Sequence, residues 1–552
     1  MIAAIIIVSY ISFLSCLYGS IFFTVFRYDQ EKDTALSFFT GFGVLTALAT
    51  IYSCFAPLSG LFPICFVSIP AFVFLIWKPD SAKSDWFFFI AQIRSLSVSV
   101  KVVLLTGWLL FLVMFPYTVS HPDTLIYHAQ LIQWIELYSP VPGIANLHRN
   151  NGLQSSWFTI SALFSFRALN THAVTYSNIA VILWFWFFGC FKLEKSYHSG
   201  TKGSFILWLL LLVTALVSYT QIRLTITSAS PDFIVCLYTW LTIYIFRVKE
   251  KQKISNEVLL FFLCFLTVSL KPSAIPILLL VPIVIFYSKN KWAKSILCAA
   301  VISIIFLAPL LYRNYVSSGY LLYPSAWPDF FSPDWKLPKD QVQLISQYIN
   351  TYAKLKSSSS PAEIQSARNL QLQNWLPIWW HFLSYMDKLI MISCALTIGI
   401  SPFIYRRLPN TREKATFLIL IFSVLFWFIA APDPRFGYGF IIPLIGIGMF
   451  QPPKLFNPVM NFNRHLLLYI LAGFIFIYSG YRITHFFFIR NFFVSSGLQP
   501  SSYLQHSIGP IKVTVPTNTD YCAGSPIPCT THSKLPFMNR GQKISDGFKP
   551  LN

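Results

Sequence analysis

The chain has 552 residues, of which 55% are hydrophobic and only 11% are charged, and its mean hydropathy is +0.59. A soluble protein usually carries about 25% charged residues, so this composition excludes a soluble multidomain protein. The net charge of +21 would suggest nucleic-acid binding in a soluble protein. Here many Lys and Arg residues lie in short loops between apolar runs, where they orient a membrane protein. We therefore expect a polytopic membrane protein with no nucleic-acid partner.

Apolar runs recur along the whole chain, and they approach the roughly 20 residues that cross about 30 Å of hydrocarbon. They predict an all-α fold with about 14 transmembrane helices and with interfacial helices in the extracytoplasmic loops. The predicted spans are 1–26, 35–57, 60–77, 101–118, 173–191, 203–219, 232–247, 256–270, 274–287, 295–312, 385–405, 415–431, 437–450 and 465–484. The first run lacks a basic segment and a cleavage site, so we expect a retained helix rather than a signal peptide.

Lys and Arg residues are dense in alternate loops, such as 247–253 and 406–414, and sparse in the others. The positive-inside rule places the dense loops in the cytoplasm. This alternation requires 256–287 to be a hairpin that is broken at Lys271-Pro272, where proline interrupts helical hydrogen bonding. The resulting divisions are N-terminal helices at 1–100, a core at 101–312 with an external loop at 119–172, an external loop at 313–384, C-terminal helices at 385–484, and an external tail at 485–552.

The external loop 119–172 holds the densest polar set of the chain and begins with His121-Pro122-Asp123. Apolar residues recur at helical spacing from Leu125 to Ile135, which indicates an amphipathic helix at the membrane surface. A carboxylate at Asp123 can activate an acceptor hydroxyl as a base, hold a divalent metal, or simply cap the helix. Further candidate substrate contacts in this loop are His121, Tyr127, His128, His148 and Arg149.

Further candidates lie at four predicted outer helix ends. Asp232 lies at the predicted membrane boundary, where a charged side chain is energetically costly and is therefore a candidate functional residue. The alternative is that it caps the helix. Lys271 suits a phosphate contact or a side chain that snorkels to the interface. Arg435 can bind phosphate bidentately or pair with Asp433 in a turn. Arg313 precedes Tyr and Trp residues that suit sugar rings or an interfacial aromatic belt.

Two cysteines stand apart from the other eight, which lie in apolar runs and suit the protein core. Cys522 and Cys529 lie in the polar tail, where their spacing predicts a short-loop disulfide if the tail is in an oxidising compartment. The alternative is a pair of free thiols. The chain has no zinc-binding pattern of Cys or His.

The motifs HPDTLIYHAQLIQW, LKPS, RNYVSSGYLLYPS and DPRFGYGF resemble, as a set, the GT-C superfamily of membrane glycosyltransferases. They are also similar to bacterial membrane proteins that are linked to surface polysaccharides. The resemblance spans residues 101–450 and extends to the tail, and it implies that residues 1–100 are an appended module. It makes Asp123 the catalytic base and Asp232 the second acidic residue. Lys271 and Arg435 would contact the donor phosphate.

The resemblance implies an inverting transferase of the bacterial inner membrane with an extracytoplasmic active site. It would move a sugar from a polyprenyl-phosphate donor to a glycan, lipid or protein acceptor, among membrane lipids, during surface glycan assembly. No cofactor is demanded, although a divalent metal is compatible with the carboxylates. One alternative is a transporter or flippase for lipid-linked saccharides. Another is a polysaccharide polymerase or ligase whose base lies in loop 313–384.

Overall fold

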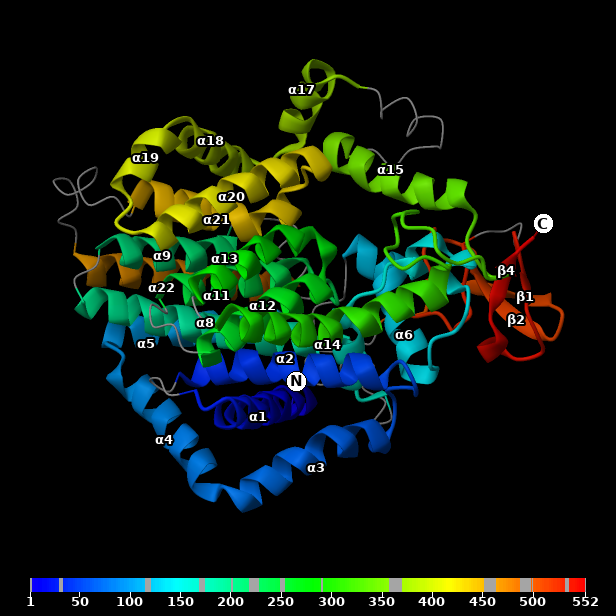
Figure 1. The fold of residues 1–552 in the computed structure, drawn as a ribbon, viewed down its shortest axis with the longest axis horizontal. Coiled ribbons are helices and arrows are strands. Elements are labelled where there is room, and N and C mark those ends of the chain that lie inside the picture. The colour runs from blue at the N-terminus through cyan, green and yellow to red at the C-terminus, as the bar shows by residue number, and fades with distance from the viewer. Residues whose placement is uncertain are drawn as a thin grey trace.

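The computed structural model describes residues 2–28, 33–114, 121–167, 174–199, 202–217, 228–248, 254–288, 291–356, 370–450, 463–486, 498, 500–531 and 536–551. Within these ranges the chain forms a helical bundle with two small β-hairpins at one end (Figure 1). The helices of the bundle are α1 (Ile2–Val25), α2 (Thr34–Tyr52), α3 (Leu61–Trp77), α4 (Pro79–Ser95), α5 (Val98–Met114), α8 (Tyr176–His198), α9 (Lys202–Val217), α11 (Asp232–Val248), α12 (Ile254–Leu270), α13 (Leu280–Tyr287), α14 (Trp292–Ser318), α18 (Tyr385–Gly399), α19 (Ser401–Arg407), α20 (Thr411–Ala430), α21 (Pro434–Phe450) and α22 (Arg464–Phe486).

The first two helices form a tight antiparallel pair that belongs to the main bundle. At Gly19 and Gly41 a Cβ atom would collide with the backbone of the other helix, so glycine lets the two backbones approach closely. α2 in turn packs against α7 (Ser156–Leu163), α8, α12 and α14. α1 and α2 are therefore part of the bundle, and α3 and α4 lie outside them, in contact with α1 (Figure 1).

The prediction of about 14 spans is wrong in number. Each predicted segment does contain helix, but in the described part of the chain only six helices are long and apolar enough to cross a membrane, or up to eight if two bent pairs each count as one span. The six are α1, α2, α8, α14, α20 and α22, and the bent pairs are α4 with α5 and α18 with α19.

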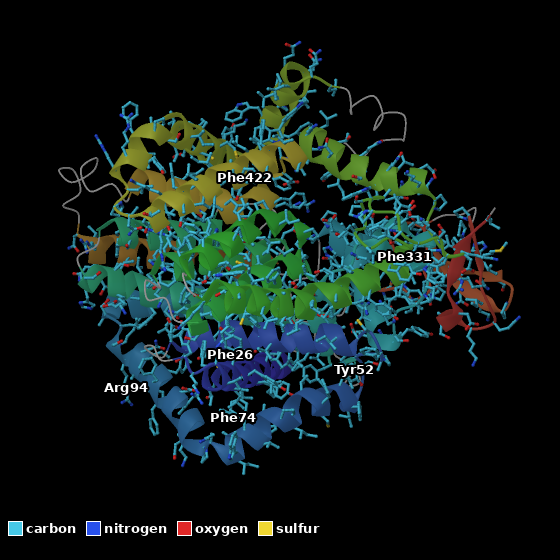
Figure 2. All side chains as sticks on the ribbon, in the orientation of Figure 1. Phe26, Tyr52, Phe74, Arg94, Phe331 and Phe422 are labelled. Carbon is cyan, nitrogen blue, oxygen red and sulfur yellow. A yellow bond between two sulfur atoms is a disulfide. The ribbon has the colours of Figure 1, made fainter. Side chains whose placement is uncertain are left out.

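Many apolar helices are buried among other helices, which explains much of the overestimate of transmembrane spans. α11 is apolar, yet nearly all of its side chains are enclosed by other helices, and hydropathy does not distinguish contact with protein from contact with lipid. The outer helices differ, because they carry exposed apolar side chains such as Phe422, which is 52% exposed (Figure 2). The assignment of loops to the two sides of the membrane stays a prediction.

The predicted break at Lys271-Pro272 is confirmed. α12 ends at Leu270, and a 3-10 helix, η5 (Pro272–Leu279), follows and leads into α13. Both η5 and α13 pack back against α12, so the chain makes a hairpin there. The break leaves Lys271 at the end of the bundle where the hairpin turns.

Three distant segments assemble at one end of the bundle into a structure that we call the cap. They comprise residues 121–167, residues 319–356 and the described residues of the tail, 500–531 and 536–551. Their named elements are η1 (Thr124–His128), α6 (Ala129–Leu137), η2 (Ile144–Asn146), η3 (Arg149–Gly152), α7, α15 (Lys339–Leu355), β1 (Tyr503–Ile508), β2 (Ile511–Pro516), β3 (Phe537–Asn539), η7 (Ile544–Asp546) and β4 (Phe548–Pro550). In Figure 1 the labelled α6, α15, β1, β2 and β4 lie together beyond the bundle.

Hydrogen bonds join the three cap segments to one another and to α14. Asn146 Nδ2 donates to Trp335 O at 3.0 Å, and Phe548 N donates to Pro142 O at 3.0 Å. Gly143 N donates to Val316 O in α14 at 2.9 Å. Gly143 has φ of +70°, and its missing side chain leaves room for the Phe548 carbonyl. The cap is therefore one packed unit made from parts that are up to about four hundred residues apart in the chain, an arrangement typical of tertiary rather than local interactions.

Two expectations about the cap need correction. α6 was expected to lie on the membrane surface, but it is buried, because the tail covers its polar face: Gln130 Nε2 donates to the carbonyls of Ala523 and Ser525. The fold is also not wholly α-helical, since β1 pairs with β2 and β3 pairs with β4 in the tail. The disulfide between Cys522 and Cys529 is confirmed, with their Cα atoms 6.1 Å apart.

The loop 313–384 is shorter than expected, because α14 continues to Ser318. Two helices of the structure, α15 and α17 (Leu372–Phe382), lie within the range of this predicted loop.

Candidate functional site

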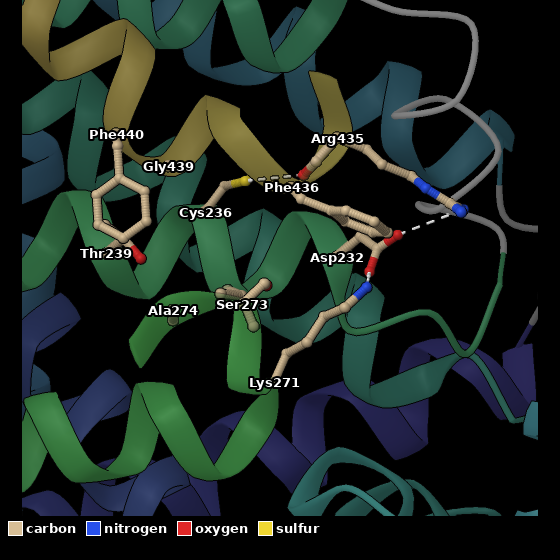
Figure 3. A pocket seen from close by; sticks show the side chains of 11 residues that line it. Asp232, Cys236, Thr239, Lys271, Ser273, Ala274, Arg435, Phe436, Gly439 and Phe440 are labelled. Carbon is tan, nitrogen blue, oxygen red and sulfur yellow. Dashed lines mark hydrogen bonds and ion pairs between the residues drawn. The ribbon is translucent and has the colours of Figure 1, made fainter. Parts of the chain in front are cut away.

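A network of charged side chains lies where the cap meets the bundle. Asp232 is the first residue of α11, Lys271 lies in the break after α12, and Arg435 is the second residue of α21. Figure 3 shows Asp232 between Lys271 and Arg435. Lys271 Nζ donates to Asp232 Oδ1, and Arg435 Nη1 lies 3.6 Å from Asp232 Oδ2.

The cap adds the second carboxylate. Arg435 Nη1 donates to Asp123 Oδ2 at 2.9 Å, so one guanidinium bridges two carboxylates that are more than a hundred residues apart in the chain. Asp123 is also the more accessible of the two, with its side chain 28% exposed against 3% for Asp232. Asp123 is therefore the carboxylate of this pair that a substrate can reach more readily.

Neither carboxylate acts as the helix cap that was the structural alternative. Asp123 has helical backbone angles and its side chain makes no capping hydrogen bond. At the start of α11, the backbone N–H of Asp232 donates to Ser230 Oγ at 3.3 Å, so Ser230 takes the capping role. Both carboxylates are left to face the basic side chains.

Asp433 supports Arg435 from within the protein. Its buried carboxylate accepts from Arg435 N through Oδ1 at 3.2 Å, and its Oδ2 lies 3.4 Å from Arg435 Nε. Trp379 Nε1 donates to Pro432 O at 2.6 Å, and Trp427 Nε1 donates to Asp433 O at 2.7 Å. The predicted Asp433–Arg435 turn pair thus exists, and it also aims the guanidinium at Asp123.

Sequence reasoning missed one member of the network. Lys356, directly after α15, donates to Asp433 Oδ2. The described network then has three carboxylates, Asp123, Asp232 and Asp433, and three cations, Lys271, Arg435 and Lys356. This balance is expected, because an unpaired buried charge is costly. No local pattern in the sequence marks Lys356, because only the fold brings the end of α15 next to Asp433 and Arg435.

The basic groups also pack against an aromatic ring. Lys271 Nζ lies 4.0 Å from the centre of the Phe436 ring, and the Arg435 guanidinium carbon lies 4.8 Å from it. These cation–π contacts stabilise the two charges where water is scarce. A narrow pocket beneath them is lined by Asp232, Cys236 and Phe436, as Figure 3 shows.

Two histidines line the cap side of the network. His121 is only 1% exposed, and its Nδ1 has no hydrogen-bond partner in the described part of the chain. Its ring is stacked with that of His128 at 6.0 Å between centres, and Thr124 Oγ1 lies 3.0 Å from His128 Nδ1. Tyr127 packs edge-on against His128 at 4.3 Å. All three predicted residues therefore lie beside Asp123.

Burial and charge set the protonation of these groups. Burial lowers the pKa of His128 to about 3, although Asp123 opposes the effect, and burial also lowers the pKa of His121. For Asp123, burial alone would raise the pKa, but the charge of Arg435, with smaller contributions from the histidines and Lys271, holds it below the usual value. At neutral pH the site therefore contains an ionised Asp123 and two neutral imidazoles.

The same geometry offers a metal-binding set. One ligand atom from each of His121, Asp123 and Asp232 lies within 4.8 Å of the others. Imidazole nitrogen and carboxylate oxygen suit a divalent cation such as Zn²⁺ or Mn²⁺. The sequence did not reveal this cluster, because Asp232 lies more than a hundred residues after His121 and Asp123. Binding there would compete with the ion pairs to Arg435 and Lys271.

Three other predicted residues have different surroundings. His148 Nδ1 accepts from Asn150 N at 3.3 Å and so caps η3. Arg313 is buried and donates to Ser53 O at 3.0 Å and to Gln154 at 3.2 Å, so it ties α14 to α2 and to the cap instead of joining the network. Arg149 accepts from Tyr323 OH at 2.7 Å through its backbone carbonyl, and η3, which begins at Arg149, packs against α15.

A family model described as "Domain of unknown function (DUF8201)" matches residues 1–442. No curated protein and no solved structure matches the chain. The matched range contains Asp123, Asp232, Lys271 and Arg435 but ends before the tail with its disulfide. The charge network therefore lies wholly in the part of the chain that the family describes.

Proposed function

We propose that this chain, which belongs to the family described as Domain of unknown function (DUF8201), is a membrane glycosyltransferase of GT-C type. It would move a sugar from a polyprenyl-phosphate donor to an extracytoplasmic acceptor in the assembly of a surface glycan. The supporting observation is the convergence of Asp123, Asp232, Lys271 and Arg435 from four separate parts of the chain into one network.

Asp123 is the base in this proposal. It takes the proton of an acceptor hydroxyl while the hydroxyl oxygen attacks the anomeric carbon of the donor sugar. The bond from that carbon to the phosphate oxygen breaks, and its electron pair leaves with the lipid phosphate. Lys271 and Arg435 stabilise the negative charge that develops on the phosphate.

The ion pair between Asp123 and Arg435 links donor binding to this step. Arg435 holds the pKa of Asp123 low, and a strongly acidic carboxylate is a weak base. A donor phosphate that draws the guanidinium toward itself would remove this partner and raise the pKa of Asp123. The base would then become effective only when the donor is in place.

The polymerase alternative, with a base in loop 313–384, has less support. In the described part of that loop, Asp329 pairs with Lys336, and Asp334 pairs with Arg540 at 2.8 Å on the outside of the cap. The loop contributes a cation, Lys356, to the network. A transporter of lipid-linked saccharides would share the basic groups but would have no need of a base at Asp123.

The test is Asp123→Asn in a strain whose own gene has been deleted. The variant keeps the side-chain size and the contact with Arg435 but removes the base, so transfer should fall by about 100-fold or more. The measurements are the surface glycan and the pool of lipid-linked sugar, which should accumulate. Asp329→Asn is the matched control on the cap. Normal surface glycan from a correctly folded Asp123→Asn protein would refute the proposal and favour transport.

A further inference from the structure

α15 presents one face to the charge network. Tyr348, Tyr352 and Lys356 recur at intervals of four residues, which places them on the same face. Lys356 at the end of this row donates to Asp433, and Asn350 Nδ2 donates to Ala430 O at 2.7 Å. These contacts hold α15 against the segment that carries Arg435, so the two tyrosines lie on the side of α15 that faces the charge network.

The two tyrosine rings form a small aromatic cluster, and Lys356 Nζ lies 5.3 Å from the centre of the Tyr352 ring. The centres of the two rings are 5.9 Å apart and their planes are inclined by 30°. Both side chains are half-buried, and their hydroxyls make no hydrogen bond within the described part of the chain. The nearby Tyr320 and Tyr323, which the sequence suggested for sugar stacking, are instead buried in the core of the cap. An aromatic face with free hydroxyls at its edge suits a pyranose, which has an apolar face and a polar rim.

Arg149 lies on η3, next to α15. η3, which begins at Arg149, packs against α15, and Arg149 is close enough to Tyr348 to act on its phenol electrostatically. The guanidinium is half-buried and has no ion pair with a described residue. The neighbouring network is balanced in charge, so its three carboxylates are already neutralised. Arg149 can therefore bind an acceptor anion without breaking an ion pair between described residues, whereas Lys271 and Arg435 would have to leave theirs to meet the donor phosphate.

We propose that Tyr348, Tyr352 and Arg149 form an acceptor subsite for an acidic pyranose. The sugar ring would stack on the two tyrosines, its carboxylate or phosphate would bind Arg149, and its free hydroxyl would face Asp123. This inference rests on the proposed transferase function, to which it adds a class of acceptor.

The test is binding of soluble sugars to the full chain in nanodiscs, followed by saturation-transfer NMR. The probes are methyl glucuronide, glucose 6-phosphate, the neutral methyl glucoside and inorganic phosphate. We expect both acidic sugars, or one of them, to bind about tenfold more tightly than the neutral sugar. The preferred acidic sugar identifies the anion as a carboxylate or a phosphate. Absence of saturable binding by both acidic sugars would overturn the proposal, as would equal binding by inorganic phosphate alone.

Substitutions assign that binding to the residues. Tyr352→Leu should weaken binding of the acidic sugar about tenfold, because the stacking surface is lost, whereas Tyr352→Phe should keep most of it. Tyr348→Leu should act similarly. Tyr348 packs against the apolar cluster of the cap, whereas Tyr352 does not. If Tyr348→Leu does not fold, Tyr352→Leu therefore still tests the subsite. Arg149→Gln should remove the preference for acidic over neutral sugar, and Arg149→Lys should restore part of it.

Tyr385→Leu is the matched control, because Tyr385 is 86% exposed on α18, a helix outside the cap. Unchanged binding in Tyr348→Leu and Tyr352→Leu would refute the subsite. Binding does not require catalysis, so the two proposals fail separately. If the sugar binds as described while Asp123→Asn keeps full transfer, the subsite stands and the role of Asp123 falls.

Discussion

Replacement of Arg435 should destabilise the protein more than replacement of any one of its partners. Its guanidinium lies 2.9 Å from Asp123, 3.6 Å from Asp232 and 3.4 Å from Asp433. Arg435→Gln leaves three carboxylates facing two lysines, and removal of one partner from a buried ion pair costs about 3–5 kcal/mol. We expect about 3 kcal/mol, the lower end, because Asp232 and Asp433 keep their own lysines and Asp123 keeps some access to water.

The double variant Arg435→Gln with Asp123→Asn distinguishes charge balance from lost packing. It removes one positive and one negative charge, and the pairs Lys271–Asp232 and Lys356–Asp433 remain. It should therefore be more stable than Arg435→Gln alone by about 1–2 kcal/mol.

Thermal unfolding in detergent measures both changes. A loss of about 3 kcal/mol should lower the apparent midpoint by about 3 °C in a chain of this length, and the double variant should recover part of that shift. Asp123→Asn alone should lower it less than Arg435→Gln. A double variant that is no more stable than Arg435→Gln would refute the reasoning, because it would show that the arginine acts through packing rather than through charge.

Three further outcomes follow from the structure. Because burial lowers the pKa of His128 to about 3 against about 6.5 in the unfolded chain, stability should fall as pH drops from about 6.5 toward 3, and His128→Asn should flatten this part of the unfolding profile. Loss of the disulfide in a Cys522→Ser and Cys529→Ser double variant should lower the free energy of unfolding by about 2 kcal/mol. It should also speed hydrogen exchange in α6, because the tail covers this helix. Unchanged exchange in α6 would show that the disulfide does not hold the tail against it. A cysteine at exposed Gln343 in the cap should react with a membrane-impermeant maleimide from outside the cell, and one at exposed Arg407 should not; the reverse result would invert the predicted orientation.

Several features of this protein follow from the sequence because they depend on composition and local pattern. Long apolar runs in a chain with few charges predict helices that avoid water, and the structure has helix at each of them. Charged residues are rare and costly in such a chain, so residue type alone nominated Asp123, Asp232, Lys271 and Arg435. The short interval between Cys522 and Cys529 likewise predicted a disulfide for a tail in an oxidising compartment, and the structure has this bond.

Other features depend on which surfaces meet, and local pattern does not carry that information. The number of spans was overestimated because an apolar helix such as α11 has the same hydropathy whether protein or lipid surrounds it. Arg313 looked like a ligand contact by type, but the fold uses it to tie helices together. Lys356 and the pair Tyr348 and Tyr352 showed no signal of their own, because only the packing of α15 against the start of α21 and against η3 brings them to the network. Residue chemistry thus nominated the charged groups, and long-range packing decided which of them share one site.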